Sequence, residues 1–249
     1  MPRRDASGRS SEAARGVGRA LSGALGDDLV AVYLHGSAVL GGFRWDRSDL
    51  DVLALSRAAL SDQQVRRVAD ALAPLCYPAN GLEFSLMTED EAAAPELPAP
   101  RFQVHVTTEG RARAGTVVDG RTRAGDTDLV LHLAVCRTRG LAVVGPPPLV
   151  ALAAIPDETV LSVMRDEIEW ARTRAPLDYL VLTSARVWLF AETRRIASKI
   201  EAGRWAARRY TQPAVIEAAL ALQRGASAEV QPEAAERLAV HVEHLAVSG

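Results

Sequence analysis

The chain has 249 residues, of which 48% are hydrophobic and 24% charged, and its formal net charge is −2. This length suits one large domain or two small ones, and the hydrophobic fraction is sufficient for a packed core. The charge gives no footprint for nucleic acid or an anionic membrane, and no apolar run approaches the roughly 20 residues of a membrane span. Without a signal peptide, and with only two cysteines, the chain is expected to be cytoplasmic, bound to neither nucleic acid nor membranes.

The first part of the chain alternates helix and strand patterns, which is typical of an α/β or α+β domain. Ser61 is the expected cap of one helix, and Pro74 ends it. An acidic, proline-rich loop is expected over 89–100. The predicted elements are, in chain order, a helix over 11–25, strands over 29–34 and 49–55, a helix from 62, strands over 82–87 and 102–107, a helix over 127–137 and a strand over 141–144.

The second part contains almost no strand signal. Helices are predicted over 159–173, 177–194, 212–223 and 232–247, with prolines near their starts, where proline is tolerated. The composition therefore predicts an α/β domain with a mixed sheet over 1–152 and an all-α helical bundle over 153–249. A site is expected in a cleft between the two, with the helical domain closing it.

The most informative motif is a Gly-Ser turn followed by two carboxylates of alternating spacing. The apolar run 29–34 leads into Gly36-Ser37, and Asp49 and Asp51 stand at the start of the next strand. Residues i and i+2 of a strand point to the same face, so the two carboxylates are expected side by side. Like charges so close repel unless a cation lies between them, and Mg2+ prefers such oxygen ligands. Backbone N–H groups and the hydroxyl of the turn are suited to phosphate.

A third carboxylate, Glu83, stands among apolar neighbours in a later predicted strand. Alternation places Glu83 on the face of Ser85 and opposite Leu82, Phe84 and Leu86. Together with the Gly-Ser turn and the two aspartates, this arrangement predicts a site that moves a nucleotidyl group.

These residues resemble the nucleotidyltransferase superfamily, and more closely the aminoglycoside adenylyltransferases that modify streptomycin and spectinomycin. The first motif alone specifies only the superfamily, whereas later helical segments point to the antibiotic-modifying branch. The segments that carry the resemblance are His35-Gly36-Ser37-Ala38-Val39, Gly41-Gly42, Ser48-Asp49-Leu50-Asp51, Leu82-Glu83, 141–146, 181–188, 196–199 and Trp205-Ala206.

The resemblance implies a role for each matching residue. Asp49 and Asp51 are implied as catalytic Mg2+ ligands, Gly36 and Ser37 as phosphate contacts, and Glu83 as the base that deprotonates the attacking hydroxyl. Glu83 as a third metal ligand, or as a buried carboxylate paired with an arginine, is the alternative. Arg186 and Lys199 match cationic residues that contact the ATP triphosphate, and surface charge is their alternative. They are 13 positions apart, so a helix break near Arg195 is needed to bring both to one ligand.

The implied reaction transfers AMP from ATP to a hydroxyl of an aminoglycoside or aminocyclitol and releases pyrophosphate, an antibiotic-resistance activity. Streptomycin-modifying members carry a tryptophan after the third carboxylate strand and acidic residues before the arginine-bearing helix. Here no tryptophan follows Glu83 in 102–107, and Arg172 and Arg174 make the second stretch basic, so spectinomycin is favoured over streptomycin. The alternative is a nucleotidyltransferase of the same fold with a protein or other metabolite as acceptor. A monomer is expected.

Overall fold

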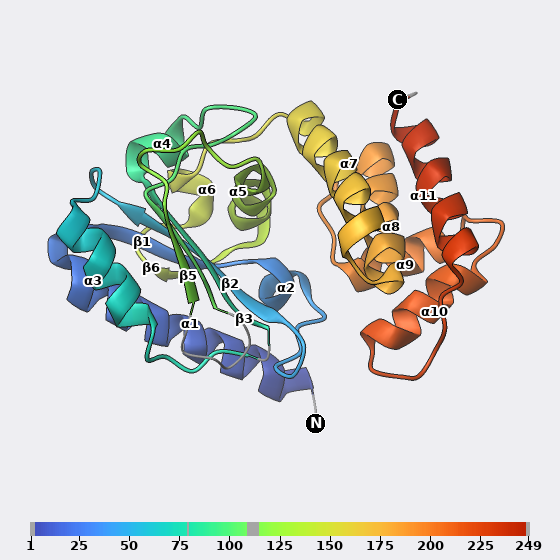
Figure 1. The fold of residues 1–249 in the computed structure, drawn as a ribbon, viewed down its shortest axis with the longest axis horizontal. Coiled ribbons are helices and arrows are strands. Elements are labelled where there is room, and N and C mark those ends of the chain that lie inside the picture. The colour runs from blue at the N-terminus through green and yellow to red at the C-terminus, as the bar shows by residue number, and fades with distance from the viewer. Residues whose placement is uncertain (1–2, 79, 109–114, 248–249) are drawn as a thin grey trace. The chain divides into compact units, whose positions relative to one another are not determined.

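The computed structural model describes residues 3–78, 80–108 and 115–247 (Figure 1). The chain divides into two compact units, Met1–Ile155 and Pro156–Gly249, and each is described by itself. The sequence placed the division close by, after residue 152. Among the helices of the described ranges, none is long and apolar enough to cross a membrane.

The N-terminal unit is a mixed sheet with helices on both faces. Its six strands have the order β5-β4-β3-β2-β1-β6; β2 and β3 are parallel, and all other neighbours are antiparallel. The strands are β1 (Leu29–Leu34), β2 (Asp49–Ser56), β3 (Gly81–Thr88), β4 (Val104–Thr108), β5 (Gly115–Asp119) and β6 (Leu141–Val144). The helices are α1 (Arg3–Leu25), α2 (Gly36–Leu40), α3 (Asp62–Leu72), α4 (Glu89–Ala93), α5 (Asp128–Arg139) and α6 (Pro148–Ala151).

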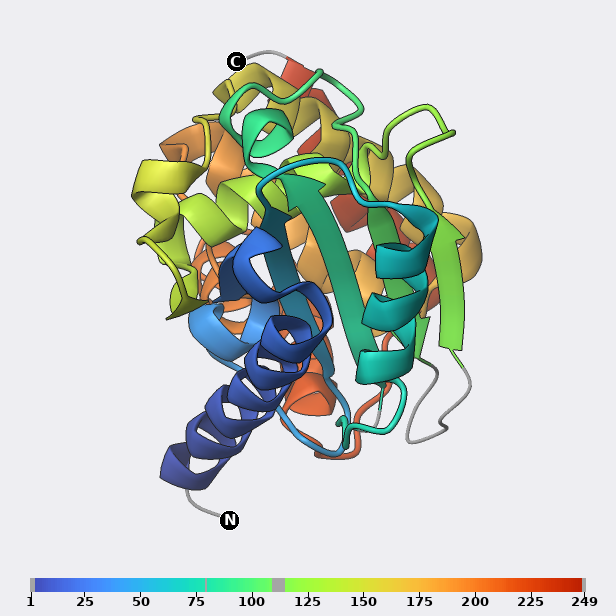
Figure 2. The same ribbon diagram turned by 90° about the vertical axis from the view of Figure 1, so that its left-hand side faces the viewer.

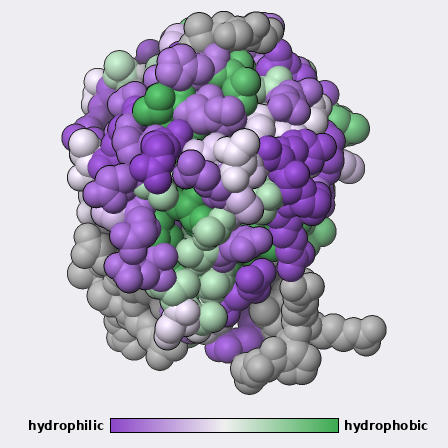
Figure 3. Space-filling model, turned by 90° about the vertical axis from the view of Figure 1, so that its right-hand side faces the viewer, coloured by the Kyte–Doolittle hydropathy of each residue, from purple (hydrophilic) through white to green (hydrophobic). Residues whose placement is uncertain are grey.

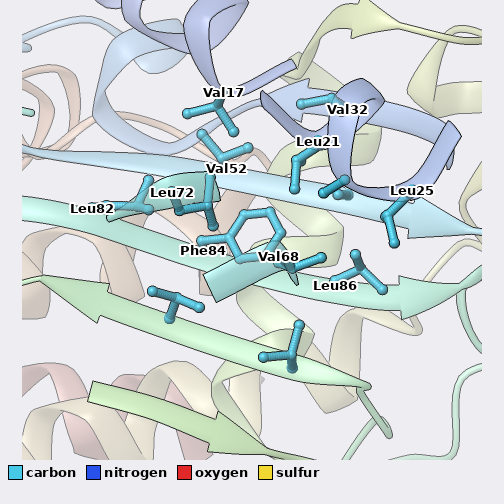
Figure 4. Close-up of a cluster of buried hydrophobic side chains, with 14 of the residues drawn as sticks. Val17, Leu21, Leu25, Val32, Val52, Val68, Leu72, Leu82, Phe84 and Leu86 are labelled. Atoms are coloured by element: carbon cyan, nitrogen blue, oxygen red, sulfur yellow. The ribbon is translucent and has the colours of Figure 1, made fainter. Parts of the chain in front are cut away.

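Alternation along the strands sends apolar side chains to both faces of this sheet, so each face needs a cover. Helices α1 and α3 cover one face (Figure 2). Figure 4 shows Val17 and Leu21 of α1 and Val68 of α3 gathered around Val52 and Phe84 of the sheet. Helix α5 packs on the other face, where a second cluster contains Tyr33, Leu53, Leu55, Met87, Leu129, Leu133 and Cys136.

Helix caps and a buried amide fix the end of the sheet where β2 and β3 finish. Ser61 and Thr88 each form a capping box at the start of α3 and α4, which satisfies backbone donors that the helices leave open. The Gln103 side chain accepts from the Leu60 N–H at 3.1 Å and donates to Glu91 Oε1 at 2.8 Å. Gln103 is buried, so these bonds compensate the cost of burying its amide.

The C-terminal unit consists of helices alone: α7 (Asp157–Arg174), α8 (Leu177–Thr193), α9 (Lys199–Ala207), α10 (Ala214–Gln223) and α11 (Pro232–Val247). Helix α8 is the central one, because it packs against each of the other four and most of its residues are buried. A proline at or next to the first residue of α7, α8, α10 and α11 pre-sets the backbone for the first turn. The face of this unit in Figure 3 is mostly hydrophilic, with hydrophobic side chains scattered among the polar ones.

The predicted mixed sheet followed by an all-helical bundle is confirmed. The strands over 29–34 and 141–144 and the helix over 232–247 have the predicted bounds. Short elements were missed: residues 36–40 form helix α2 where a turn was expected, and α4 lies in the segment predicted as an acidic loop. Strand β5 and helices α6 and α9 were also not predicted; short elements carry too few residues for a periodic signal.

Candidate active site

The pairing of β2 with β3 brings three carboxylates together, as the sequence predicted. Asp51 is the register partner of Glu83 in the parallel pair, and Asp49 lies two residues before Asp51 on the same face. One carboxylate oxygen of each residue lies within 4.8 Å of the others. Leu82, Phe84 and Leu86 are in the core on the opposite face, as expected for a strand that alternates. We call Asp49, Asp51 and Glu83 the acidic triad.

The Gly36-Ser37 segment lies directly against this triad. The His35 N–H donates to the Asp51 carbonyl at 3.0 Å, and the Ser37 N–H donates to Asp51 Oδ2 at 3.3 Å. Gly36 has a φ of +60°, and a Cβ added there would lie 1.8 Å from Asp51 Oδ2. Only glycine fits a backbone that approaches a carboxylate so closely in the left-handed region. The segment opens helix α2, so the expected turn is the first turn of a short helix.

Asp51 is in an environment that opposes its negative charge. It is 8% exposed. Its pKa is raised well above 3.8, first by burial and then by repulsion from Asp49 and Glu83; the Ser37 N–H acts in the opposite direction. A cation bound to the triad would remove both costs. All three donors are carboxylates, a donor set that suits a hard cation such as Mg2+.

Ser37 carries a second sign of a ligand. Its Oγ is buried and has no hydrogen-bond partner within the part of the chain that the structure describes. A buried hydroxyl without a partner costs free energy, so an oxygen of a bound molecule is a natural partner for it. The observation fits the predicted phosphate contact.

Two histidines, His132 and His105, lie near Glu83, and a third, His35, packs against His132. His132 of α5 has its Nε2 3.4 Å from Glu83 Oε1. The His132 ring packs against the buried His35, with ring centroids 5.1 Å apart. On β4, His105 Nδ1 and Ser85 Oγ are 2.9 Å apart in a hydrogen bond. Burial lowers the pKa of both His35 and His105, which favours neutral rings.

His132 is a residue that sequence reasoning missed. In the sequence, His132 has no spacing to other histidines or cysteines that would mark it as a metal ligand. Its place becomes visible once the helix is laid on the sheet, because Leu129, Leu133 and Cys136 pack on the sheet face that carries the triad. The signal in the sequence is a polar residue three positions after one core leucine and next to another.

Arg186 and Lys199 belong to the C-terminal unit. The helix break that their spacing required is present, since α8 ends at Thr193, Arg194 adopts a left-handed conformation (φ 54°), and α9 begins at Lys199. The Lys199 ammonium lies 3.5 Å from the centre of the Tyr179 ring, a cation–π contact. The Tyr179 hydroxyl is 2.6 Å from Glu167 Oε1.

The basic stretch before Arg186 is less basic than its sequence indicates. Arg172 forms ion pairs with Glu243 at 2.7 Å, with Glu236 at 3.2 Å and with Glu169. The hydrogen bonds with these carboxylates, first with Glu243, raise the pKa of Arg172. Its charge is thus compensated, which weakens one of the two sequence arguments against streptomycin. We call these four residues the Arg172 cluster.

Comparisons with known proteins point in the same direction as the site. Residues 151–248 match the family described as aminoglycoside adenylyltransferase, C-terminal domain. The aminoglycoside (3'') (9) adenylyltransferase of Klebsiella pneumoniae is 28% identical over 213 residues, which cover 76% of each chain. A spectinomycin 9-adenylyltransferase of Staphylococcus aureus is 27% identical over 191 residues, covering 73% of this chain and 72% of that protein.

A solved structure extends the likeness to the fold. The spectinomycin adenyltransferase AAD(9) from Enterococcus faecialis, solved with ATP and spectinomycin, has a TM-score of 0.73. The alignment covers 95% of this chain and 98% of that one, at 19% sequence identity. The mixed sheet followed by a helical unit therefore has the fold of that spectinomycin adenyltransferase. Within that class of fold, residues 151–248 match the C-terminal domain of the aminoglycoside adenylyltransferases, and about three quarters of the chain is similar to enzymes of that name.

Proposed function

We propose that this protein transfers AMP from ATP to a hydroxyl of an aminocyclitol or aminoglycoside antibiotic, with spectinomycin favoured over streptomycin. The observation that carries the proposal is the acidic triad beside the Gly36-Ser37 segment. Spectinomycin is named for several relatives along about three quarters of the chain, and the AAD(9) structure contains ATP and spectinomycin.

In the proposed reaction the acceptor hydroxyl oxygen attacks the α-phosphorus of ATP. A new P–O bond forms, the bond from the α-phosphorus to the oxygen bridging to the β-phosphorus breaks, and pyrophosphate leaves with that electron pair. Glu83 accepts the proton of the hydroxyl, a step that typically contributes about 10²- to 10⁴-fold in rate. The Ser37 Oγ binds a phosphate oxygen, and Gly36 allows the backbone to approach the phosphate closely.

Asp49 and Asp51 are the proposed Mg2+ ligands. Mg2+ bound there supplies charge neutralisation for the triphosphate and for the leaving pyrophosphate. The fit rests on the burial of Asp51 and the repulsion around it, which a divalent cation would relieve. Arg186 and Lys199 are proposed to bind the triphosphate, as predicted from the family resemblance. A monomeric state stays a prediction.

The decisive experiment measures pyrophosphate release by the purified protein with ATP and Mg2+, in parallel with spectinomycin, streptomycin and no acceptor. We expect release with spectinomycin, and none without an acceptor. Glu83→Gln is expected to lower turnover by about 10²-fold or more because it removes the base. Asp90→Asn is the matched control, since Asp90 is an exposed carboxylate of the same unit.

The outcomes separate the alternatives. Release with both drugs would leave the transferase in place and overturn the preference for spectinomycin. If the protein binds ATP but releases no pyrophosphate with either drug, the antibiotic is not the acceptor. That result would favour a protein or another metabolite as the acceptor. Full activity of Glu83→Gln would contradict the assignment of the base.

A further inference from the structure

His132 is the feature of the active site for which the proposed reaction has no use so far. Helix α5 is held on the sheet by Leu129, Leu133 and Cys136, all of which are buried. This packing fixes the backbone of the helix, and His132 projects from it toward Glu83. The His132 side chain is only 19% exposed. A side chain held in this way is suited to fixing the position of another one.

The ring of His35 restrains His132 further. The two rings are tilted by 51° with centroids 5.1 Å apart, and His35 is itself buried. The backbone N–H of His35 is bonded to Asp51, so the packing surface behind His132 belongs to the strand-to-helix connection of the site. The imidazole of His132 therefore contacts the buried ring of His35 and also lies close to the carboxylate of Glu83.

Glu83 needs such a restraint because two destinations compete for its carboxylate. One is the acceptor hydroxyl, for which it is the proposed base. The other is a metal ion at Asp49 and Asp51, since one Glu83 oxygen lies within 4.8 Å of one oxygen of each aspartate. A carboxylate that binds the metal is a weaker base, because the cation stabilises its charged form. A group that contacts one Glu83 oxygen therefore influences whether the carboxylate binds the metal or accepts the proton.

Resting on the proposed function, we propose that His132 is a positioning residue for Glu83: its Nε2 holds Oε1, which limits further turning of the carboxylate toward the two aspartates and leaves Oε2 for the proton of the acceptor hydroxyl. The 3.4 Å separation is slightly longer than a hydrogen bond, as is common for catalytic contacts before substrate binds.

Steady-state kinetics on His132→Leu and His132→Gln test the proposal. In His132→Leu we expect kcat to fall about tenfold or more because the base is misplaced, with the KM values for ATP and spectinomycin nearly unchanged. Glutamine has an N–H donor that reaches a similar position, so His132→Gln is expected to recover most of kcat. Arg139→Gln is the matched control, an exposed residue near the end of the same helix.

A double-mutant cycle separates positioning from a purely structural role. If His132 acts through Glu83, then His132→Leu has no further effect in the Glu83→Gln background. Losses that multiply in the double variant, or an unchanged kcat in His132→Leu, would overturn the proposal. If the wild-type protein releases pyrophosphate with neither drug, the proposed function fails, and the proposal is then decided on metal binding alone.

Mn2+ titration followed by electron paramagnetic resonance provides that second readout. Without His132, Glu83 is free to turn toward the two aspartates, so Mn2+ is expected to bind His132→Leu several-fold more tightly than the wild type. The gain should disappear in the Glu83→Gln background. Equal Mn2+ affinity of His132→Leu and the wild type would contradict the proposal, whatever the acceptor is.

Discussion

The acidic triad and the Arg172 cluster are two groups of charged residues with opposite designs. In the triad, strand register forces carboxylates together, and their repulsion raises the pKa of Asp51. In the Arg172 cluster, one guanidinium is surrounded by carboxylates of α7 and α11. In the first group, carboxylates of the same sign lie within 4.8 Å of one another, an arrangement that suits a cation from solution. In the second, a residue of one sign is surrounded by residues of the other.

This difference provides a way to distinguish a ligand-binding site from a structural ion-pair cluster when both contain many charged residues. Ion pairs that are satisfied within the fold contribute modestly to stability and offer little to a ligand. Like charges held together by a rigid sheet cost stability, and the cost is recovered when a ligand binds. The comparison therefore predicts that the two groups respond to substitution in opposite ways.

The largest expected effect is on activity at the triad. Asp51→Asn should lower turnover by at least about 10²-fold, because it removes a proposed Mg2+ ligand, whose loss would cost several kcal/mol of transition-state stabilisation. Pyrophosphate release with ATP, Mg2+ and spectinomycin measures the loss, and Asp27→Asn, at an exposed carboxylate, is the control. Full activity of Asp51→Asn would contradict this prediction, because it would mean that the Asp51 carboxylate is not needed to bind a cation.

A substitution at Gly36 should follow in size. Gly36→Ala places a Cβ against Asp51 Oδ2 and strains the backbone, so we expect a loss of about 2 to 4 kcal/mol in the free energy of unfolding. Gly41→Ala is the matched control, because Gly41 also has a positive φ (96°) but no atom within 4 Å of an added Cβ. Urea denaturation measures the free energy of unfolding of both variants. Gly41→Ala reports the backbone strain alone, and Gly36→Ala reports the strain together with the clash against Asp51. Equal losses would mean that the backbone at Gly36 does not approach Asp51 closely.

The raised pKa of Asp51 makes the stability of the metal-free protein depend on pH. Between the ordinary value of 3.8 and the raised value, the folded state binds more protons than the unfolded state, so stability falls as pH rises through this window. Asp51→Asn should remove that fall and melt at a higher temperature than the wild type at neutral pH without Mg2+. Thermal unfolding across pH measures it, and parallel curves for the two proteins would show that Asp51 is not under strain.

The smallest effect is expected in the Arg172 cluster. Arg172→Met should lower the stability of the helical unit by about 1 kcal/mol, because the partners of Arg172 are partly exposed and screened by solvent. Tryptophan fluorescence during urea denaturation reports chiefly on this unit, which contains Trp170, Trp188 and Trp205. Arg174→Met, at an exposed position, is the control. If Arg172→Met changes the KM for the drug without lowering stability, Arg172 belongs to a binding site. That result would contradict its assignment as a purely structural residue.

Much of this architecture could be predicted from the sequence, because it follows from the alternation of apolar residues along the strands and from the spacing of the carboxylates. The alternation over 82–87 placed Glu83 opposite the core residues of its strand, and the D-x-D spacing placed Asp49 and Asp51 on one face; the structure confirms both. The sequence pattern does not show how a helix packs across a sheet. The neighbours His132 and Glu83 are 49 positions apart in sequence, so only the packing of α5 brings them together.

The parallel register of β2 and β3 also has a consequence for anyone who prepares this protein. Moving one strand by a single residue would turn Glu83 to the opposite face of the sheet and separate it from Asp51. A misfolded preparation with that error would contain every active-site residue and still be inert, rather than partly active. Turnover per mole of protein thus becomes a count of molecules with correctly aligned strands, and active-site titration after refolding serves as a quality control that spectroscopy of secondary structure cannot replace.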